Sequence, residues 1–162
     1  MTEGIDILIK NADEIVTLQG SKTPRKGEEM NELAIVKNGS IAIKDGRIID
    51  IGKLKGYNAK KVIDALGKTI IPGFVDSHTH LVFSGYREFE LDLKLKGLSY
   101  TQIKEMGGGI GYTVKRTREA SMKDLMKDTM KRLDMMLAHG TTTCEGKSGY
   151  GLNTETELRI LE

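Results

Sequence analysis

The first 68 residues alternate apolar and polar positions with a period of two, the pattern of half-buried β-strands. The segment IDILIK places Ile5, Ile7 and Ile9 on one face, and EIVTL continues the pattern after Asn-Ala-Asp, which predicts a turn. A polar segment with glycine and proline then runs from Gln19 to Glu32. Its composition predicts an exposed loop.

Two turn signals interrupt the isoleucine-rich stretch that follows this loop. They are Asn38-Gly39 and Asp45-Gly46. Asp-Gly between apolar runs favours a two-residue hairpin, because both central residues of that turn need positive φ. We therefore expect a small antiparallel sheet at the start of the chain.

The pattern changes near Gly67 to strands that alternate with helices. TIIPGFVDSHTHLVF and TTTCEG predict two buried strands, and NTETELRILE predicts the start of a helix. Between the strands, apolar residues at helical spacing predict a helix that begins after Ser121 and ends at Gly140. This order indicates βαβ units and a parallel sheet. The helix carries methionines that we expect to face the sheet, Met122, Met126, Met130 and Met136.

Composition narrows the possible functions. The 162 residues are 38% apolar and 30% charged, which is typical of a folded soluble protein, and the net charge of +2 gives no footprint for nucleic acid or membrane. The single cysteine, Cys144, excludes a disulfide framework and predicts a small buried side chain. Because the N-terminus lacks a secretory pattern and no apolar run approaches ~18 residues, we expect a cytoplasmic protein.

The candidate chemistry lies in the segment DSHTH. On a strand, Asp76, His78 and His80 share one face. Inward-facing ionisable groups need partners, and two neutral imidazoles spaced two residues apart suit a metal ion. A bare H-x-H also occurs as a hydrogen-bonded or surface pair. Apolar flanks and the preceding Pro-Gly favour the metal site here.

The same stretch carries a resemblance to known enzymes. PGFVDSHTHLVF resembles the first barrel strand of the amidohydrolase superfamily, and NGSIAIKDGRIIDIGK resembles its N-terminal β-sandwich. Longer segments are similar to the imidazolonepropionases, which open the imidazolone ring in histidine degradation. The resemblance is most specific at Arg87-Glu88, 107–110 and 147–151. It implies an α/β fold, with a partial β-sandwich subdomain in 1–68 and the first units of a TIM-type (β/α)8 barrel in 69–162.

The resemblance also implies roles for individual residues. His78 and His80 match the two metal ligands of the first strand, for one zinc or iron ion. Arg87 and Tyr150 match substrate-contacting positions, and Tyr100 matches a further tyrosine near the pocket. The implied substrate, 4-imidazolone-5-propanoate, carries a carboxylate, for which an arginine fork is a natural clamp.

Simpler interpretations remain open for several of these side chains. Arg87 could pair with Glu88 or Glu90 at the surface, and Tyr150 could anchor its glycine-rich loop. His139 is expected to be a cation at a helix C-terminus with no catalytic role. GGGIG lacks the spacing of a dinucleotide or phosphate loop, so it predicts a flexible or close-approach loop. The sequence assigns no role to Glu145.

The resemblance further implies groups that these 162 residues do not supply. The family's metal site also takes a histidine and an aspartate from later strands, its acid–base groups lie there too, and a barrel needs about 250 residues. We therefore expect an N-terminal portion of a dimeric enzyme, inactive alone, with a weak or empty metal site. Alternatives are another cyclic-amide hydrolase or aminohydrolase of the superfamily, or a non-catalytic interaction module.

Overall fold

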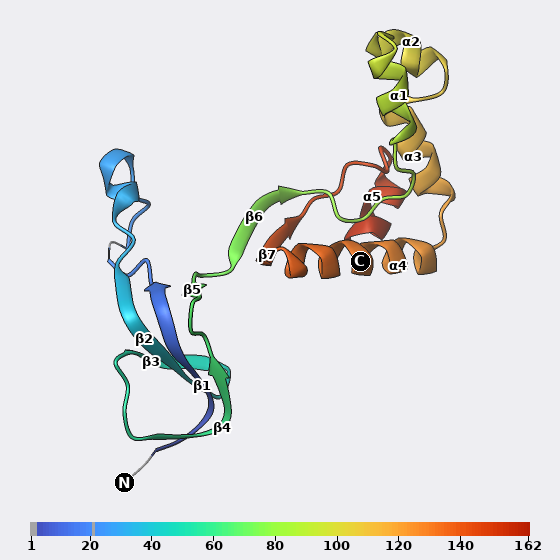
Figure 1. The fold of residues 1–162 in the computed structure, drawn as a ribbon. Coiled ribbons are helices and arrows are strands. Elements are labelled where there is room, and N and C mark those ends of the chain that lie inside the picture. The colour runs from blue at the N-terminus through green and yellow to red at the C-terminus, as the bar shows by residue number, and fades with distance from the viewer. Residues whose placement is uncertain (1–2, 21) are drawn as a thin grey trace. The chain divides into compact units, whose positions relative to one another are not determined.

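Strands occupy the first part of the chain, and strands mixed with helices occupy the second (Figure 1). The computed structural model describes residues 3–20 and 22–162 and divides the chain into unit 1, Met1–Pro72, and unit 2, Gly73–Glu162. The division falls a few residues after the expected one at 68/69. Unit 1 contains β1 (Glu3–Val16), a 3-10 helix (Gly27–Asn31), β2 (Ile35–Lys44), β3 (Arg47–Gly52), β4 (Tyr57–Asp64) and β5 (Thr69–Ile70).

The strands of unit 1 form one mixed sheet in the order β3-β2-β1-β4, with β5 also paired to β1. β1–β2 and β2–β3 are antiparallel, as predicted, whereas β4 and β5 run parallel to β1. The expectation of a purely antiparallel sheet is therefore wrong. The chain passes from β3 to the opposite side of β1, and this crossover makes the added pairs parallel. The sheet buries a small apolar cluster, Ala12, Ile15, Ile41 and Ala65.

The predicted turn at Asn-Ala-Asp is absent, because β1 continues through it. The register between β1 and β2 shifts between Ile9 and Ala12, and Asn11 has a φ of 61°. Across from this bulge lies the other supposed turn, where Asn38 has a φ of 50° and Gly39 pairs with Ala12. Both signals thus mark facing irregularities within paired strands, since a bulge also needs a residue that tolerates positive φ.

Two other predictions for unit 1 are confirmed. Asp45 and Gly46 have φ values of 51° and 71°, and the flanking Lys44 and Arg47 pair with each other, which makes a two-residue hairpin. The segment from Gln19 to Glu32 lies outside the sheet and is largely exposed where it is described; Ser21 lies outside the described residues.

Unit 2 has the predicted βαβ order. It contains β6 (Phe74–Thr79), α1 (Phe89–Leu95), α2 (Tyr100–Glu105), α3 (Gly109–Glu119), α4 (Met122–Ala138), β7 (Thr141–Gly146) and α5 (Thr154–Leu161). β6 and β7 pair in parallel, and α4 packs against β7. The strands are not buried as predicted, since Phe74 is 55% and Val75 71% exposed, and Cys144 is only half-buried. Parallel strands become buried when helices cover both faces of their sheet. Among the described residues, no helix covers the second face of the β6–β7 pair.

Helix α4 begins and ends as the sequence predicts. The Ser121 hydroxyl accepts a hydrogen bond from the Asp124 backbone N–H at 3.1 Å, and Gly140 follows the helix with a φ of 93°. His139 is the C-terminal cap residue, and its Nδ1 lies 2.8 Å from the Met135 carbonyl oxygen. The helix therefore has both of its predicted end signals.

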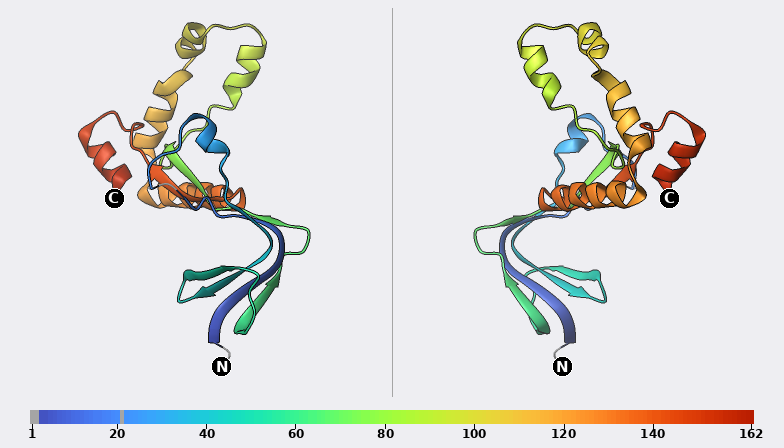
Figure 2. Two further views of the ribbon diagram at one scale, coloured as in Figure 1. Left: turned by 90° about the vertical axis from the view of Figure 1, so that its left-hand side faces the viewer. Right: turned by 90° about the vertical axis from the view of Figure 1, so that its right-hand side faces the viewer.

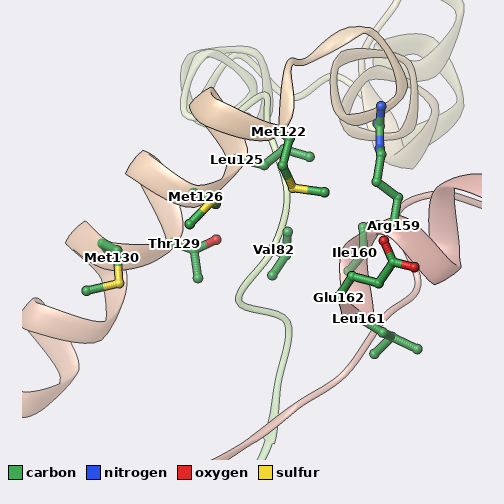
Figure 3. A pocket seen from close by; sticks show the side chains of 10 residues that line it. All are labelled: Val82, Met122, Leu125, Met126, Thr129, Met130, Arg159, Ile160, Leu161 and Glu162. Carbon is green, nitrogen blue, oxygen red and sulfur yellow. The ribbon is translucent and has the colours of Figure 1, made fainter.

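Met126 and Met130 of α4 do not pack against the sheet, whereas Met136 is half-buried. Leu125 is the buried residue of this helix, whereas Met126 is 61% and Met130 55% exposed. Figure 3 shows that these methionines line an open apolar groove between α4 and the last residues of α5. The prediction of a buried stripe is wrong because a two-stranded sheet is too narrow to cover the whole apolar face of a 17-residue helix.

Helices α1, α2 and α3 project together beyond the β6–β7 pair (Figures 1 and 2). α3 is joined to the segment after β6 by threonine hydroxyls. Thr113 Oγ1 donates to the Gly85 carbonyl at 2.9 Å, and Thr117 Oγ1 accepts from the Ser84 N–H at 3.0 Å. Among all the described helices, none is long and apolar enough to cross a membrane.

Candidate functional site

The two imidazoles of the H-x-H segment lie together at the C-terminal end of β6. Their ring centres are 5.6 Å apart, with His78 exposed and His80 half-buried. Asp76, expected on the same face, uses its Oδ1 to accept a hydrogen bond from the backbone N–H of His78 at 3.1 Å. The pair is therefore placed by strand geometry, and the nearby carboxylate is engaged locally.

The two rings fit one metal ion, although they do not complete its coordination. An ion about 2.1 Å from one nitrogen of each ring keeps the ring centres within roughly 6–7 Å, and the observed separation meets that limit. The Nδ1 atom of His80 is buried and has no hydrogen-bond partner among the described residues, so this polar atom lacks the partner that burial demands. Within the same residues, no group of three or more His, Cys, Asp or Glu side chains could hold a metal.

Tyr150 reaches the imidazoles from the loop after β7. Its ring lies 5.2 Å from the His80 ring at 61° and 5.3 Å from the Phe83 ring. Because β6 and β7 are parallel, their C-terminal ends lie at one edge, and a hydrogen bond from Lys147 N to Thr79 O extends the pairing into the loop. The sequence-predicted proximity of Tyr150 to the H-x-H pair is thus found.

Glycines allow this loop to approach His80 and α5 closely. Gly149 has a φ of 136°, and a Cβ there would lie 3.0 Å from His80 Cε1. A Cβ on Gly151 would lie 2.8 Å from the backbone nitrogen of Glu157. The two glycines therefore serve different contacts, one with the imidazole and one with the helix backbone.

The carboxylate of Glu157, in α5, holds the same loop. It accepts hydrogen bonds from the N–H groups of Gly149, Gly151 and Leu152 at 2.7, 2.9 and 2.7 Å. Burial tends to raise the pKa of Glu157, but these hydrogen bonds and one with Ser148 outweigh it and lower the pKa. Sequence analysis missed this residue, because a glutamate in the first turn of a polar helix gives no distinctive pattern.

Arg87 lies in a second cluster, built on α1, α2 and α3. Its Nη1 is 4.0 Å from Oε1 of Glu90, so the simpler pairing with Glu90 is observed. Glu90 is nearly buried, and it accepts a hydrogen bond from Gly109 N at 2.6 Å and lies 3.8 Å from Lys94 Nζ. The predicted close-approach role of GGGIG is found here, since a Cβ on Gly108 would meet Ile103 at 2.7 Å.

Tyr100 belongs to this second cluster as well. A Cβ on Gly109 would lie 3.1 Å from its hydroxyl, and the Tyr100 side chain is otherwise exposed. No ring contact or hydrogen bond in the described part of the chain joins Arg87 or Tyr100 to the imidazoles. The structure therefore brings His78, His80 and Tyr150 together and leaves Arg87 and Tyr100 in a separate group.

Arg132 of α4 holds the segment that connects the two clusters. Its guanidinium lies 3.7 Å from the Phe83 ring centre and donates to the carbonyls of Leu81 and Phe83 and to the Tyr86 hydroxyl. Nothing in the helical pattern distinguished this arginine from the other cations of α4. Its function is visible only once the segment after β6 is seen to pass over the helix.

Glu145 of β7, to which the sequence assigned no role, pairs with Lys147. The hydrogen bond from Lys147 Nζ is the main cause that lowers the pKa of Glu145, and the positive charge of the same ammonium group lowers it further. This pair lies at the strand end that carries Tyr150. The ion pair keeps the Glu145 carboxylate ionised and bound to Lys147.

Comparison with known proteins gives one family model, that of the amidohydrolase family, which matches residues 61–145. The imidazolonepropionase of Alkaliphilus metalliredigens is 50% identical over 98% of this chain and 39% of its own length. That of Caldanaerobacter subterraneus subsp. tengcongensis is 51% identical over 96% of this chain and 38% of its own. The chain thus spans about two-fifths of the length of these relatives.

Solved structures share the fold at low sequence identity. A triazine hydrolase variant superposes with a TM-score of 0.61 at 17% identity, covering 95% of this chain and 32% of its own. A prolidase complexed with N-methylphosphonate-L-proline gives a TM-score of 0.56 at 16% identity, over 88% of this chain and 26% of its own. The predicted α/β fold class is thereby confirmed.

Proposed function

Because the chain belongs to the amidohydrolase family, we propose that it supplies part of the active site of an enzyme that hydrolyses 4-imidazolone-5-propanoate. The observation that carries the proposal is the placement of His78, His80 and Tyr150 at one strand edge, with ring centres 5.6 and 5.2 Å apart. About 50% identity to relatives named imidazolonepropionase supports the choice of substrate.

In this proposal, His78 and His80 are two of the ligands of a zinc or iron ion. Imidazole nitrogen suits either metal. When bound, the ion supplies the Lewis acidity that activates water for attack on an amide. The buried Nδ1 of His80, which lacks a partner among the described residues, is consistent with a site whose remaining members lie elsewhere.

Arg87, Tyr150 and Tyr100 are the proposed substrate-binding residues. A guanidinium 4.0 Å from Glu90 is held only loosely, so its fork can receive the propionate carboxylate of the substrate. Tyr150 offers a ring face and a hydroxyl to the flat heterocycle next to the imidazoles. Tyr100 lies in the Arg87 cluster and would approach the same end of the substrate.

The reaction is the hydrolysis of a cyclic amide. Water adds to the ring carbonyl carbon, the adjacent C–N bond breaks, and the departing ring nitrogen takes a proton, which gives N-formimidoyl-L-glutamate. We assign the proton-transferring groups and the other metal ligands to parts of the protein outside these 162 residues, since the relatives are more than twice as long. We further propose a cytoplasmic homodimer that acts on a small molecule and binds neither nucleic acid nor membrane.

A substrate panel tests this function in the full-length protein, by which we mean this chain together with the rest of the proposed barrel. Hydrolysis of 4-imidazolone-5-propanoate is compared with that of hydantoin, dihydroorotate and an aminopurine. We expect kcat/KM to be highest, by at least about 100-fold, for the imidazolone. A preference for another compound would assign a different amidohydrolase reaction, and no turnover of any of them would favour a non-catalytic module.

The variant Arg87→Lys refines the same test. It keeps the positive charge but loses the planar fork, so KM for the imidazolone should rise about tenfold or more while the bound metal is unchanged. Lys94→Arg, at the other cation of Glu90, is the matched control and should leave KM unchanged. Equal KM values for wild type and Arg87→Lys would remove Arg87 from the substrate site.

A further inference from the structure

The loop that carries Tyr150 is hydrogen-bonded through its backbone to the carboxylate of Glu157. Both oxygens of the Glu157 carboxylate are used, Oε2 by Gly149 N–H and Oε1 by the N–H groups of Gly151 and Leu152, all within 2.9 Å. Hydrogen bonds to an ionised acceptor are about twice as strong as neutral ones. Three of them, from the amides of Gly149, Gly151 and Leu152, make Glu157 the main constraint on the path of this loop.

A second contact fixes the loop through a backbone carbonyl group. Arg118, at the end of α3, donates from Nε to the Gly151 carbonyl oxygen at 2.6 Å. The loop is therefore bound through its N–H groups to α5 and through a carbonyl to α3. Tyr150 lies between Gly149 and Gly151, so its backbone has little freedom while both contacts are intact.

Gly149 transmits this constraint to the candidate metal site. Its Cα lies so close to His80 that an added Cβ would come within 3.0 Å of the ring, and Glu157 binds its N–H. The next residue, Tyr150, then presents its ring to His80 at 5.2 Å. Movement of Gly149 away from the imidazole would thus withdraw Tyr150 with it.

We propose that Glu157 is a positioning residue, which sets Tyr150 against His80 and thereby determines how the site receives the flat ring of its substrate. This inference rests on the proposed function for the part that concerns substrate. It identifies a residue outside the candidate ligand and substrate groups as the one that sets the distance between Tyr150 and His80.

Glu155 provides a matched control. It is also an acidic residue in the first turn of α5, but it is exposed, and its side chain has no hydrogen-bond or ion-pair partner in the part of the chain that the structure describes. Glu155→Gln therefore removes the same charge from the same helix end without touching the loop. Any effect of Glu157→Gln that depends only on helix charge should appear in both variants.

The substitution Glu157→Gln replaces one of the two acceptor oxygens of the carboxylate with an NH2 group. Its amide oxygen can still accept from two of the loop N–H groups, but its NH2 group then opposes a third N–H. One charged hydrogen bond is lost, and an unfavourable donor–donor contact replaces it. Amide exchange at residues 149–152 should therefore become about tenfold faster or more. Hydrogen–deuterium exchange of that peptide in the full-length protein measures this rate. Glu155→Gln should match wild type.

Kinetics in the same protein test the link to Tyr150. We expect Glu157→Gln to raise KM for 4-imidazolone-5-propanoate about tenfold, with kcat changed much less and bound metal unchanged. Tyr150→Ala removes the ring that Glu157 is proposed to position. In a Tyr150→Ala background, Glu157→Gln should therefore add little to KM, since two residues that act through one contact are not additive.

Three results would overturn the inference. The first is equal exchange at 149–152 in Glu157→Gln and Glu155→Gln. The second is a fall in kcat, bound metal and melting temperature together, which indicates a structural role alone. The third is multiplication of the Glu157 and Tyr150 effects on KM. If wild type does not hydrolyse the imidazolone, the proposed function fails, and the exchange comparison still decides whether Glu157 holds the loop.

Discussion

At the scale of single residues, the site depends on positions where a side chain cannot be added. Gly149 combines a φ of 136° with a close approach to His80. The structure thus gives a physical reason for glycine at this position, which the sequence marked only as part of the segment 147–151 that resembles the family. The same loop contains Gly151. A Cβ there would meet the helix backbone, which cannot move aside by a side-chain rotation.

The variant Gly149→Ala tests this account. Its Cβ would collide with the imidazole, so we expect His80 to shift, the full-length protein to lose most of its bound metal, and the free energy of unfolding to fall by about 1–3 kcal/mol. Gly97→Ala is the control, since Gly97 also has positive φ but open space around it. Metal content by mass spectrometry distinguishes them, and a Gly149→Ala protein with full metal would contradict the prediction.

The sequence predicted the placement of three candidate side chains, because that placement follows from strand geometry. His78 and His80 are two apart on a strand, and Tyr150 follows a neighbouring parallel strand, so one sheet edge collects all three. Glu157 and Glu90 could not be predicted in this way. Each binds backbone N–H groups of a loop whose path exists only in the folded chain.

At the scale of elements, α1 and α3 are joined by a nearly buried carboxylate. Glu90→Ala removes the acceptor of Gly109 N–H and the partner of Arg87 and Lys94. We expect the free energy of unfolding to fall by about 1–3 kcal/mol, because the buried N–H is left unpaired. Urea denaturation of the full-length protein measures this.

The control for Glu90 is Glu88→Ala, two residues earlier and exposed. It should change the free energy of unfolding by less than about 0.5 kcal/mol, as most exposed substitutions do. Equal losses in the two variants would show that Glu90 does not join the helices as described.

The lowered pKa of Glu157 predicts a pH dependence for its loop. A carboxyl with a lowered folded pKa binds protons less readily than in the unfolded chain, so its stabilisation is complete above the reference value of 4.5 and is lost as pH falls through the folded pKa. We expect amide exchange at 149–152, corrected for intrinsic rates, to accelerate below pH 4.5. Glu157→Gln should lack this acceleration, and an identical profile in both proteins would contradict the assignment.

Turn signals show why element boundaries were only partly predictable. Asp45-Gly46 forms the hairpin, while Asn38-Gly39 and Asn-Ala-Asp face each other as irregularities in β1 and β2. All three signals report tolerance of positive φ, and that tolerance serves a bulge as well as a turn. Which use applies depends on the strand opposite, and a local sequence pattern does not contain that information.

At the scale of the whole molecule, unit 2 leaves apolar surface uncovered. β6 and β7 pair only with each other among the described strands, and Met126 and Met130 line an open groove. The 162-residue chain alone should therefore self-associate as its concentration rises. Met126→Lys with Met130→Lys should reduce the association seen by sedimentation, whereas Met30→Lys, an exposed methionine of unit 1, should not. A wild-type chain that stays monomeric would contradict this expectation.

The most direct test of the central claim is the metal content of the full-length protein and of its histidine variants, measured with imidazolone hydrolysis in the same samples. We predict one zinc or iron ion per chain, with metal and activity both lost, activity by at least about 1000-fold, in His78→Ala and His80→Ala. His139→Ala, at the end of α4, should keep both. Wild-type metal content and hydrolysis in His78→Ala or His80→Ala would contradict the account.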